Sequence, residues 1–194
     1  MKSAKVTSLL WLAGISAAQT PEGFTPAVEE KLEVTFGTKP IDTAGTLLTK
    51  AETAQRPTIG LTGTADKVYL WMMIDIDAST NFINPGAGQP ATYLHTVLRD
   101  FEASGDASES DVTTLGTTAT GPVAWFAPAP AAENPPHPHR YTNLLWEQPE
   151  KAWIIPSGAS TMLQSQKLGF DVPAFIEAAG LGAPVAANYF NVTG

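Results

Sequence analysis

The sequence predicts a mainly β domain with few helices. Runs of strand length, rich in β-branched and aromatic residues, recur along the chain, and the strongest (residues 67–77, KVYLWMMIDID) contains no Gly or Pro. Clusters of Gly, Pro, Asn and Ser separate these runs, as expected for turns between strands. Helix signals appear only late in the chain, where Asp171 can cap a helix that Gly180 stops.

The N-terminus predicts a signal peptide over residues 1–18. Lys2 and Lys5 form a basic start, residues 6–15 are apolar, and a small-residue cleavage site ends at Ala18. An apolar segment of about ten residues is too short to cross a bilayer. We therefore expect no transmembrane segment, and secretion of residues 19–194 as one domain to the extracellular space or cell wall. The alternative is an amphipathic N-terminal helix of a cytosolic protein.

The first half of the mature chain predicts three clear strands. Residues 31–36 alternate apolar and polar side chains, which is typical of a strand with one buried face. Residues 67–77 predict a central strand buried on both faces, with a buried helix as the alternative. A loop over residues 81–90 leads to the next strand, residues 91–101. Residues 46–54 fit either a strand or a short helix.

The second half is organised around a proline-rich loop. Residues 102–120 are polar and acidic and predict a surface turn with one short strand. The prolines over residues 128–138 exclude a helix or a central strand and predict a semi-rigid extended loop. Residues 141–146 then predict a buried strand. After the late helix, residues 185–192 predict the last strand.

Composition excludes several classes of function. The formal net charge is −8, and removal of Lys2 and Lys5 with the signal peptide makes it −10. So acidic a chain has no electrostatic footprint for nucleic acid, and anionic membrane surfaces should repel it. The absence of cysteine excludes thiol redox chemistry and thiolate metal sites. Asn191 begins the sequon Asn-Val-Thr and is a candidate for glycosylation.

Two carboxylates end the most hydrophobic strand. Asp75 and Asp77, two residues apart, are expected on one face of that strand, about 7 Å from each other. They can serve as acid–base groups, metal ligands or acceptors that orient a histidine. The alternatives are a solvated strand end and, for Asp77, a salt bridge to Arg140.

The three histidines give no clear metal or catalytic signature. His95 lies in an apolar strand, where a lone histidine is usually a satisfied core residue. His137 and His139 flank Pro138, and an HxH pair on a strand can chelate zinc. Pro138 and the lack of a further ligand at a recognisable spacing lead us to expect no metal and no cofactor. Without a nucleophile elbow, P-loop or GxGxxG motif, we also expect no catalytic residue.

Four segments, in this order, resemble the phosphatidylethanolamine-binding protein family, in a secreted, fungal-type form. They are residues 75–80 (DIDAST), His95 within its strand, residues 121–141 (from Gly-Pro to His-Arg-Tyr), and residues 183–190 (APVAANYF). The resemblance spans residues 32–192. It implies a β-sandwich of two antiparallel sheets with a few short helices, and a small anion pocket at one end.

Carried over residue by residue, the resemblance implies a set of ligand-binding residues: Asp75, His95, Pro122, His139 and Phe190. Asp77 and Arg140 also match the family's motifs, and we expect them to form a structural charge pair. This chain departs from the family at Ile76 and Ser79, which replace two prolines, and at Phe190, where the family often has a tyrosine.

The resemblance implies a non-enzymatic binding protein whose ligand is a phosphate-bearing small molecule or a phospholipid head group. The alternative is a protein-interaction role, because family members inhibit kinases and a serine carboxypeptidase, and secretion leaves protease inhibition open. A hydrolase that uses Asp75, His95 and His139 is a third reading and lacks a nucleophile. Because protonated imidazoles offer two donors and a positive charge, we expect anion binding to strengthen on acidification.

Overall fold

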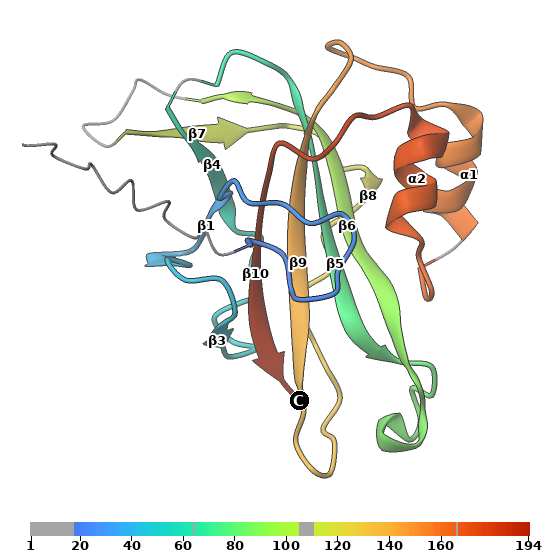
Figure 1. Cartoon of the computed structure of the whole chain (residues 1–194). Helices are drawn as coiled ribbons and strands as arrows, with labels where there is room; N and C mark the ends of the chain where they lie inside the picture. The colour runs from blue at the N-terminus through green and yellow to red at the C-terminus, as the bar shows by residue number, and fades with distance from the viewer. Residues whose placement is uncertain (1–17, 64, 105–110, 166) are drawn as a thin grey trace, which may run out of the picture.

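The computed structural model describes residues 18–63, 65–104, 111–165 and 167–194 (Figure 1). The predicted signal peptide therefore lies outside the described residues, apart from Ala18. Strands dominate the described chain, so the mainly β class is confirmed. No helix among the described residues has the length and apolar character needed to cross a membrane.

The described strands form one curled sheet in the order β2-β1-β4-β7-β6-β5-β9-β10-β3, with β8 paired to β6 (Figure 1). Their bounds are β1 Glu33–Phe36, β2 Lys39–Pro40, β3 Thr46–Leu48, β4 Thr58–Thr62, β5 Tyr69–Ser79, β6 Pro90–Ala103, β7 Val112–Gly116, β8 Pro122–Val123, β9 Pro138–Glu147 and β10 Ala186–Thr193.

The long strand β6 joins the two halves of the sheet. Most of it pairs with β5, whereas Glu102 and Ala103 at its end pair with β7. One pair, β3 with β10, is parallel. The expected pair of separate antiparallel sheets is therefore not confirmed in that form.

The prediction that residues 67–77 form a central strand buried on both faces is confirmed by β5. It pairs with β6 on one side and β9 on the other. Because side chains alternate along a strand, Trp71 and Met73 enter one apolar cluster and Leu70 and Met72 enter a second. The first cluster fills the inside of the curled sheet, and the second lies under the helices.

Two helices cover the outer face of the sheet (Figure 1). The predicted one is α2, Val172–Ala179: Asp171 accepts a hydrogen bond from the backbone N–H of Ala174 at 2.9 Å, and Gly180 ends the helix in the left-handed region. The sequence did not predict α1, Ser157–Ser165. Its Ser, Thr and Gly content gives weak helix propensity, so packing of its few apolar side chains must hold it.

The other predicted strands agree with the structure except at their ends, whereas β2, β4 and β8 were not predicted. The surface turn expected within residues 102–120 falls partly on residues 105–110, which lie outside the described residues. Residues 46–54 form the short strand β3 followed by turns, and the loop over 81–90 contains the short 3₁₀ helix η1, Pro85–Ala87. The strand predicted at 141–146 is β9, which pairs with β5 as expected but begins at Pro138. His139 therefore lies inside a strand, between β5 and β10, and not in the proline-rich loop.

Candidate functional site

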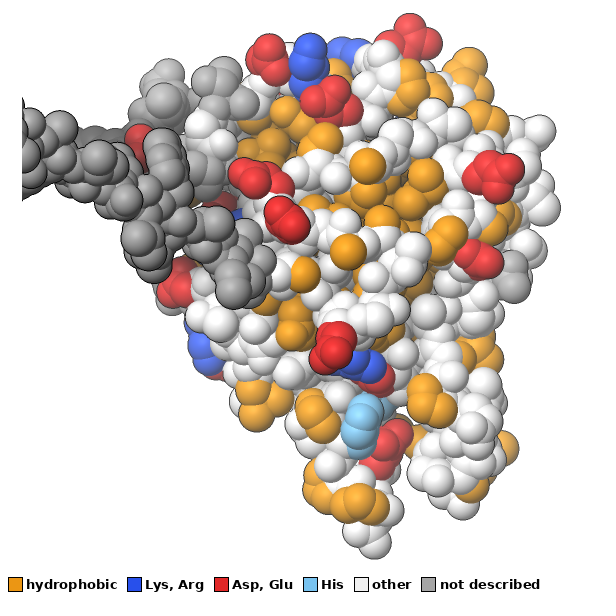
Figure 2. Space-filling view, in the orientation of Figure 1, with side chains coloured by type: hydrophobic (Ala, Val, Ile, Leu, Met, Phe, Trp, Pro, Cys, Tyr) orange, Lys and Arg blue, Asp and Glu red, His pale blue; other side chains and the backbone are white. Residues whose placement is uncertain are grey.

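A pocket of about 320 Å³ opens where β5, β6 and β9 end. In Figure 2 this end of the molecule carries two projecting parts with a hollow between them, bordered by hydrophobic side chains. Much of its lining is apolar, from Phe82 and Pro85 on one side to Phe126 and residues 129–131 on the other. Its polar lining residues are Asp75, Ser79, Tyr93, His95, His139 and Tyr141.

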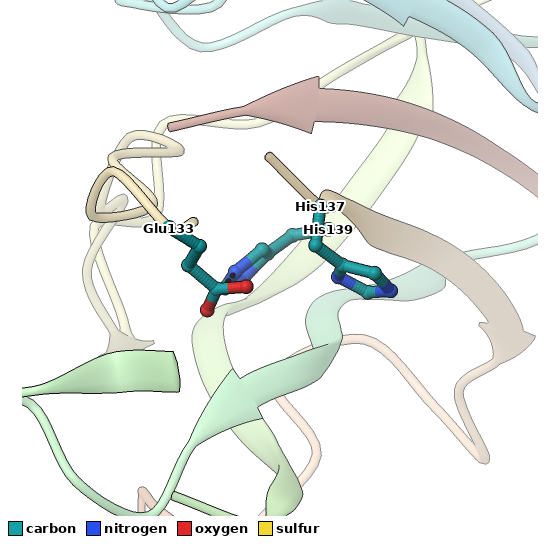
Figure 3. A group of neighbouring side chains, drawn as sticks. All are labelled: Glu133, His137 and His139. Carbon is teal, nitrogen blue, oxygen red and sulfur yellow. Dashed lines mark ion pairs between the residues drawn. The ribbon is translucent and has the colours of Figure 1, made fainter. Parts of the chain in front are cut away.

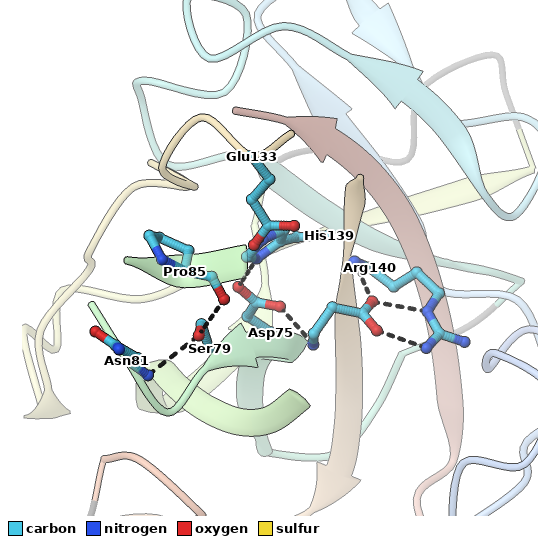
Figure 4. A network of polar contacts seen from close by, with 8 residues as sticks. Asp75, Ser79, Asn81, Pro85, Glu133, His139 and Arg140 are labelled. Carbon is cyan, nitrogen blue, oxygen red and sulfur yellow. Dashed lines mark hydrogen bonds and ion pairs between the residues drawn. The ribbon is translucent and has the colours of Figure 1, made fainter. Parts of the chain in front are cut away.

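Asp75 and His139 form the central polar pair of this pocket (Figure 4). The pairing of β5 with β9 sets Asp75 opposite Tyr141, two residues from His139. The Nδ1 atom of His139 lies 2.8 Å from Oδ2 of Asp75, and Oδ1 of the same carboxylate accepts the backbone N–H of Asp77 at 2.8 Å. Both side chains are buried. The carboxylate therefore fixes the orientation of the imidazole.

The other ring nitrogen of His139 is unusual because it is buried and has no hydrogen-bond partner among the described residues. It lies 3.6 Å from Oε1 of Glu133. Burial alone would lower the pKa of His139, but the hydrogen bond to Asp75 and the nearby negative charges raise it above its usual value. The ring can therefore carry a proton on each nitrogen under mildly acidic conditions.

His95 has the opposite character. Its Nδ1 atom lies 2.9 Å from the backbone oxygen of Phe126, and because a carbonyl only accepts, Nδ1 carries the proton. Burial lowers the pKa of His95, which keeps the ring neutral near pH 7 and leaves Nε2 as an acceptor. The ring also stacks on Phe126, with centroids 5.2 Å apart. The expectation that both histidines act as protonated donors is therefore not supported for His95.

Tyr141 is a pocket residue that the sequence analysis did not name. It lies two residues after His139 on β9 and so faces the same side, a spacing that could have revealed it. Its ring packs edge-on against His95, with centroids 5.1 Å apart. Burial, followed by the charge of Asp75 and a hydrogen bond to it, raises the pKa of Tyr141 well above its usual value. The hydroxyl of Tyr141 therefore stays neutral.

The structure does not place Phe190 or Pro122 on the wall of the main pocket. Phe190 is fully buried and stacks behind Tyr141, with ring centroids 5.4 Å apart, because it lies on β10 opposite Tyr141. Pro122 lines a second hollow, which shares Tyr93, His95 and Phe126 with the main pocket. Both expectations are corrected: Phe190 supports the pocket from the core, and Pro122 borders its neighbour.

Asp77 and Arg140 form the expected charge pair (Figure 4). The guanidinium donates to both carboxylate oxygens, at 2.8 and 2.7 Å, and the backbone N–H of Arg140 adds a bond of 2.9 Å. Burial opposes ionisation of Asp77, yet these bonds hold the pKa of its carboxyl below its usual value. A register shift between Asp75 and Ala78 breaks the alternation on which the single-face expectation relied, and the two carboxylates take different partners.

Ser79 anchors the loop at the pocket mouth (Figure 4). Its hydroxyl donates to the backbone oxygen of Pro85 at 2.8 Å and accepts the backbone N–H of Asn81 at 3.1 Å. The loop so held presents Phe82 and Ile83, whose side chains are 63% and 98% exposed. A serine where the family's motif has a proline is thus used to fix this loop.

Glu133, His137 and His139 gather at the end of the proline-rich loop (Figure 3). One nitrogen or oxygen atom from each lies within 4.8 Å of the others. Glu133 and His137 come from the loop before β9, and neither lines the main pocket. Glu133 was not predicted as a candidate ligand, because no familiar spacing links it to the HxH pair.

Asn191, the glycosylation candidate, is partly buried on β10, between β9 and β3. Its Nδ2 atom, which would carry a glycan, donates to the backbone oxygen of Gly45 at 2.9 Å. In this fold the amide joins β10 to the turn before β3.

Comparison with known proteins gives one family. The sequence model of the phosphatidylethanolamine-binding protein family matches residues 26–190. Phomoidride biosynthesis cluster protein N of Talaromyces stipitatus is 33% identical over 190 residues, which cover 89% of each chain. A 26 kDa secreted antigen of Toxocara canis is 28% identical over 176 residues, or 91% of this chain and 61% of the antigen. Among solved structures, carboxypeptidase Y inhibitor complexed with its cognate proteinase superposes with a TM-score of 0.59 at 18% identity, over 86% of this chain and 84% of that one.

Proposed function

This chain belongs to the phosphatidylethanolamine-binding protein family, and we propose that its pocket binds a phosphate-bearing small molecule or a phospholipid head group without turning it over. The observation that carries the proposal is the buried Asp75–His139 pair in a pocket whose walls are otherwise largely apolar. Charged groups are rarely buried without a specific partner. A buried histidine with a raised pKa, paired to a carboxylate in a pocket, is a candidate functional group.

The polar groups of the pocket suit a head group that has both an anionic and a donor part. Protonated His139 keeps its bond to Asp75 through Nδ1 and offers Nε2–H to a phosphate oxygen. Neutral His95 offers Nε2 as an acceptor for an O–H or N–H of the same ligand. The two histidines therefore recognise different parts of one molecule.

The walls suit the rest of an amphiphile. About 320 Å³ lies at the small end of the range for ligand pockets and fits a head group, not a whole lipid. Phe82 and Phe126, at the mouth, are 63% and 53% exposed and offer apolar contact to a chain that leaves the pocket. None of the described residues lining the pocket is Lys or Arg, so recognition rests on single hydrogen bonds and should be of modest affinity.

We also propose that the protein is secreted. The sequence of residues 1–18 supports this, with its basic start, apolar segment and small residues before the cleavage point. One relative is described as a secreted antigen, which agrees with the proposal. Intact mass of the protein recovered from medium is expected to begin at Gln19, and a form that retains Met1 inside the cell would contradict it.

A second candidate function is the inhibition of a protease such as a serine carboxypeptidase. The specific observation in its favour is the exposure of Phe82, Ile83 and Phe126 around the pocket mouth. Exposed apolar side chains gathered at one place mark surfaces for partners. The likeness to carboxypeptidase Y inhibitor itself shows the common fold.

Chemical-shift mapping tests the leading proposal. Isotope-labelled protein, kept in a chelator to exclude metals, is titrated with glycerophosphoethanolamine, a soluble phosphodiester. We expect saturable shifts at Tyr93, His95 and His139 and none at Trp153, which lies near the helices. Shifts confined to the apolar mouth upon addition of a carboxypeptidase, with none from the phosphodiester, would favour the second candidate instead.

A further inference from the structure

We propose that Glu133, His137 and His139 form a zinc-binding site at the loop that leads into β9. The inference goes beyond the proposed function, because two of these three residues lie outside the pocket. It also revises the sequence-based expectation of no metal, which lacked a third ligand for the HxH pair.

The hydrogen bonding of the His139 ring supports the proposal. Its Nδ1 atom is bonded to Asp75 at 2.8 Å, while its Nε2 atom is buried and has no hydrogen-bond partner in the part of the chain that the structure describes. Histidines that bind metals through one nitrogen usually donate the other N–H to a carboxylate, which fixes the tautomer and the ring orientation. Asp75 and His139 reproduce that arrangement. The Nε2 lone pair then faces Glu133, whose Oε1 is 3.6 Å away (Figure 3).

The chemical types of the three ligands also favour zinc. Two imidazoles and one carboxylate are a known zinc combination with three protein ligands, in which water takes the fourth position. Nitrogen ligands disfavour Ca²⁺ and Mg²⁺, which take oxygen donors. The negative charges of Glu133 and Asp75, and the net charge of −8 of the chain, attract a divalent cation to this place.

The three ligand atoms can also move close enough together to bind one ion. Ligand atoms at the corners of a tetrahedral zinc site are about 3.3 Å apart, given bonds of about 2.0 Å. The three atoms lie within 4.8 Å of one another, so a small approach completes the site. Glu133 and His137 belong to a loop without regular secondary structure, and His137 is exposed. Exposed side chains change rotamer within nanoseconds, which makes this approach easy.

Zinc titration of chelator-treated, dialysed protein tests the proposal. We expect one Zn²⁺ per chain, bound with micromolar or tighter affinity in competition with a metal indicator. His137→Ala and Glu133→Gln should each weaken binding by about tenfold or more, and Asp75→Asn, which removes the carboxylate behind His139, by about 10- to 100-fold. X-ray absorption at the zinc edge should show two imidazole ligands.

Two matched variants make the result specific. His95→Gln alters a histidine of the pocket that is not a proposed ligand and should bind zinc as the wild type does. Circular dichroism checks that each variant is folded, which is expected for His137→Ala and Glu133→Gln because both positions are on the loop. Absence of stoichiometric zinc binding by the wild type, or wild-type affinity in both loop variants, would overturn the proposal. If His95→Gln loses phosphodiester binding but keeps zinc binding, the result supports a zinc site that does not include His95.

Discussion

The Nδ1 atom of His139 lies 2.8 Å from Oδ2 of Asp75, although 64 residues separate the two in the chain. The pairing of β5 with β9 brings them together, and both are buried at the end of the sheet. A buried carboxylate–imidazole pair fixes one ring nitrogen and leaves the other for a ligand. Both proposed ligands, the phosphate group and the zinc ion, depend on this one contact.

Asp75→Asn should destabilise the fold modestly. The change keeps the shape of the side chain but removes the charge that binds His139 and accepts the N–H of Asp77. We expect the free energy of unfolding to fall by about 1–3 kcal/mol, measured by urea denaturation. Asp42→Asn, at an exposed aspartate, is the control and should change it by less than about 0.5 kcal/mol. Equal effects of the two variants would mean that the Asp75–His139 contact contributes nothing.

The Asp77–Arg140 pair should make stability depend on pH in the acid range. The pKa of Asp77 is held below its usual value in the fold, so its contribution is complete above the unfolded pKa, about 3.9. The contribution is lost as pH falls through the lower, folded pKa. The difference in unfolding free energy between wild type and Asp77→Asn should therefore be constant from about pH 7 to 5 and shrink below about pH 4. If the difference in unfolding free energy instead grows on acidification, the pKa of Asp77 is not lowered in the fold.

Phe190→Tyr should cost stability without creating a pocket donor. The ring is fully buried between Phe36 and Tyr141, so an added hydroxyl enters the core without an assigned partner. We expect a loss of about 1–3 kcal/mol in unfolding free energy, with phosphodiester affinity unchanged within about twofold. If the variant instead binds the ligand more tightly at unchanged stability, Phe190 reaches the pocket and its placement in the core is wrong.

Gly88→Ala should loosen the loop at the pocket mouth. A methyl group at this position would collide with the hydroxyl of Ser79 and crowd the backbone of Asn81, both of which hold the loop. We expect about 1–3 kcal/mol of destabilisation and faster hydrogen exchange over residues 80–88. Gly86→Ala, in the same loop with nothing near the added carbon, is the matched control and should be close to neutral.

Glu133→Gln should act in opposite directions on the two proposed ligands. Its carboxylate lies 3.6 Å from Nε2 of His139 and competes with an anion for that atom. Removing the charge should strengthen phosphodiester binding, by about 1 kcal/mol or fivefold, while it weakens zinc binding. Calorimetry with each ligand, in chelator for the phosphodiester, measures both. A change in the same direction for both ligands would contradict this prediction.

Much of the fold follows from local sequence patterns. Local signals predicted β5 and α2. They are the uninterrupted apolar run of β5, and the Asp171 cap and Gly180 stop of α2, and the tertiary packing agrees with both. Helix α1 has no such signal, because five of its nine residues are Ser, Thr or Gly, and packing against α2 and the sheet holds it. The strand order, with β6 shared by both halves, depends on contacts distant in sequence.

The site was predictable only in part, for a physical reason. The Asp75, His95 and His139 side chains do meet in one pocket. The roles of the two histidines differ because a backbone oxygen of Phe126 reaches one of them and a carboxylate reaches the other, and no residue pattern encodes the first contact. Phe190 does not line the pocket, because the ring of Tyr141 lies between it and the pocket. Glu133 approaches His139 from outside the pocket, on a loop whose path the sequence does not determine.

His139 is proposed to hold the phosphate-bearing ligand, and calorimetry measures this binding. Glycerophosphoethanolamine is titrated, in chelator, into wild type, His139→Ala and His137→Ala, the last being the neighbouring histidine outside the pocket. The account predicts that wild type and His137→Ala bind alike and that His139→Ala binds at least about tenfold more weakly, the loss of one charge-assisted hydrogen bond. Equal binding by all three proteins, or binding by none, would contradict it.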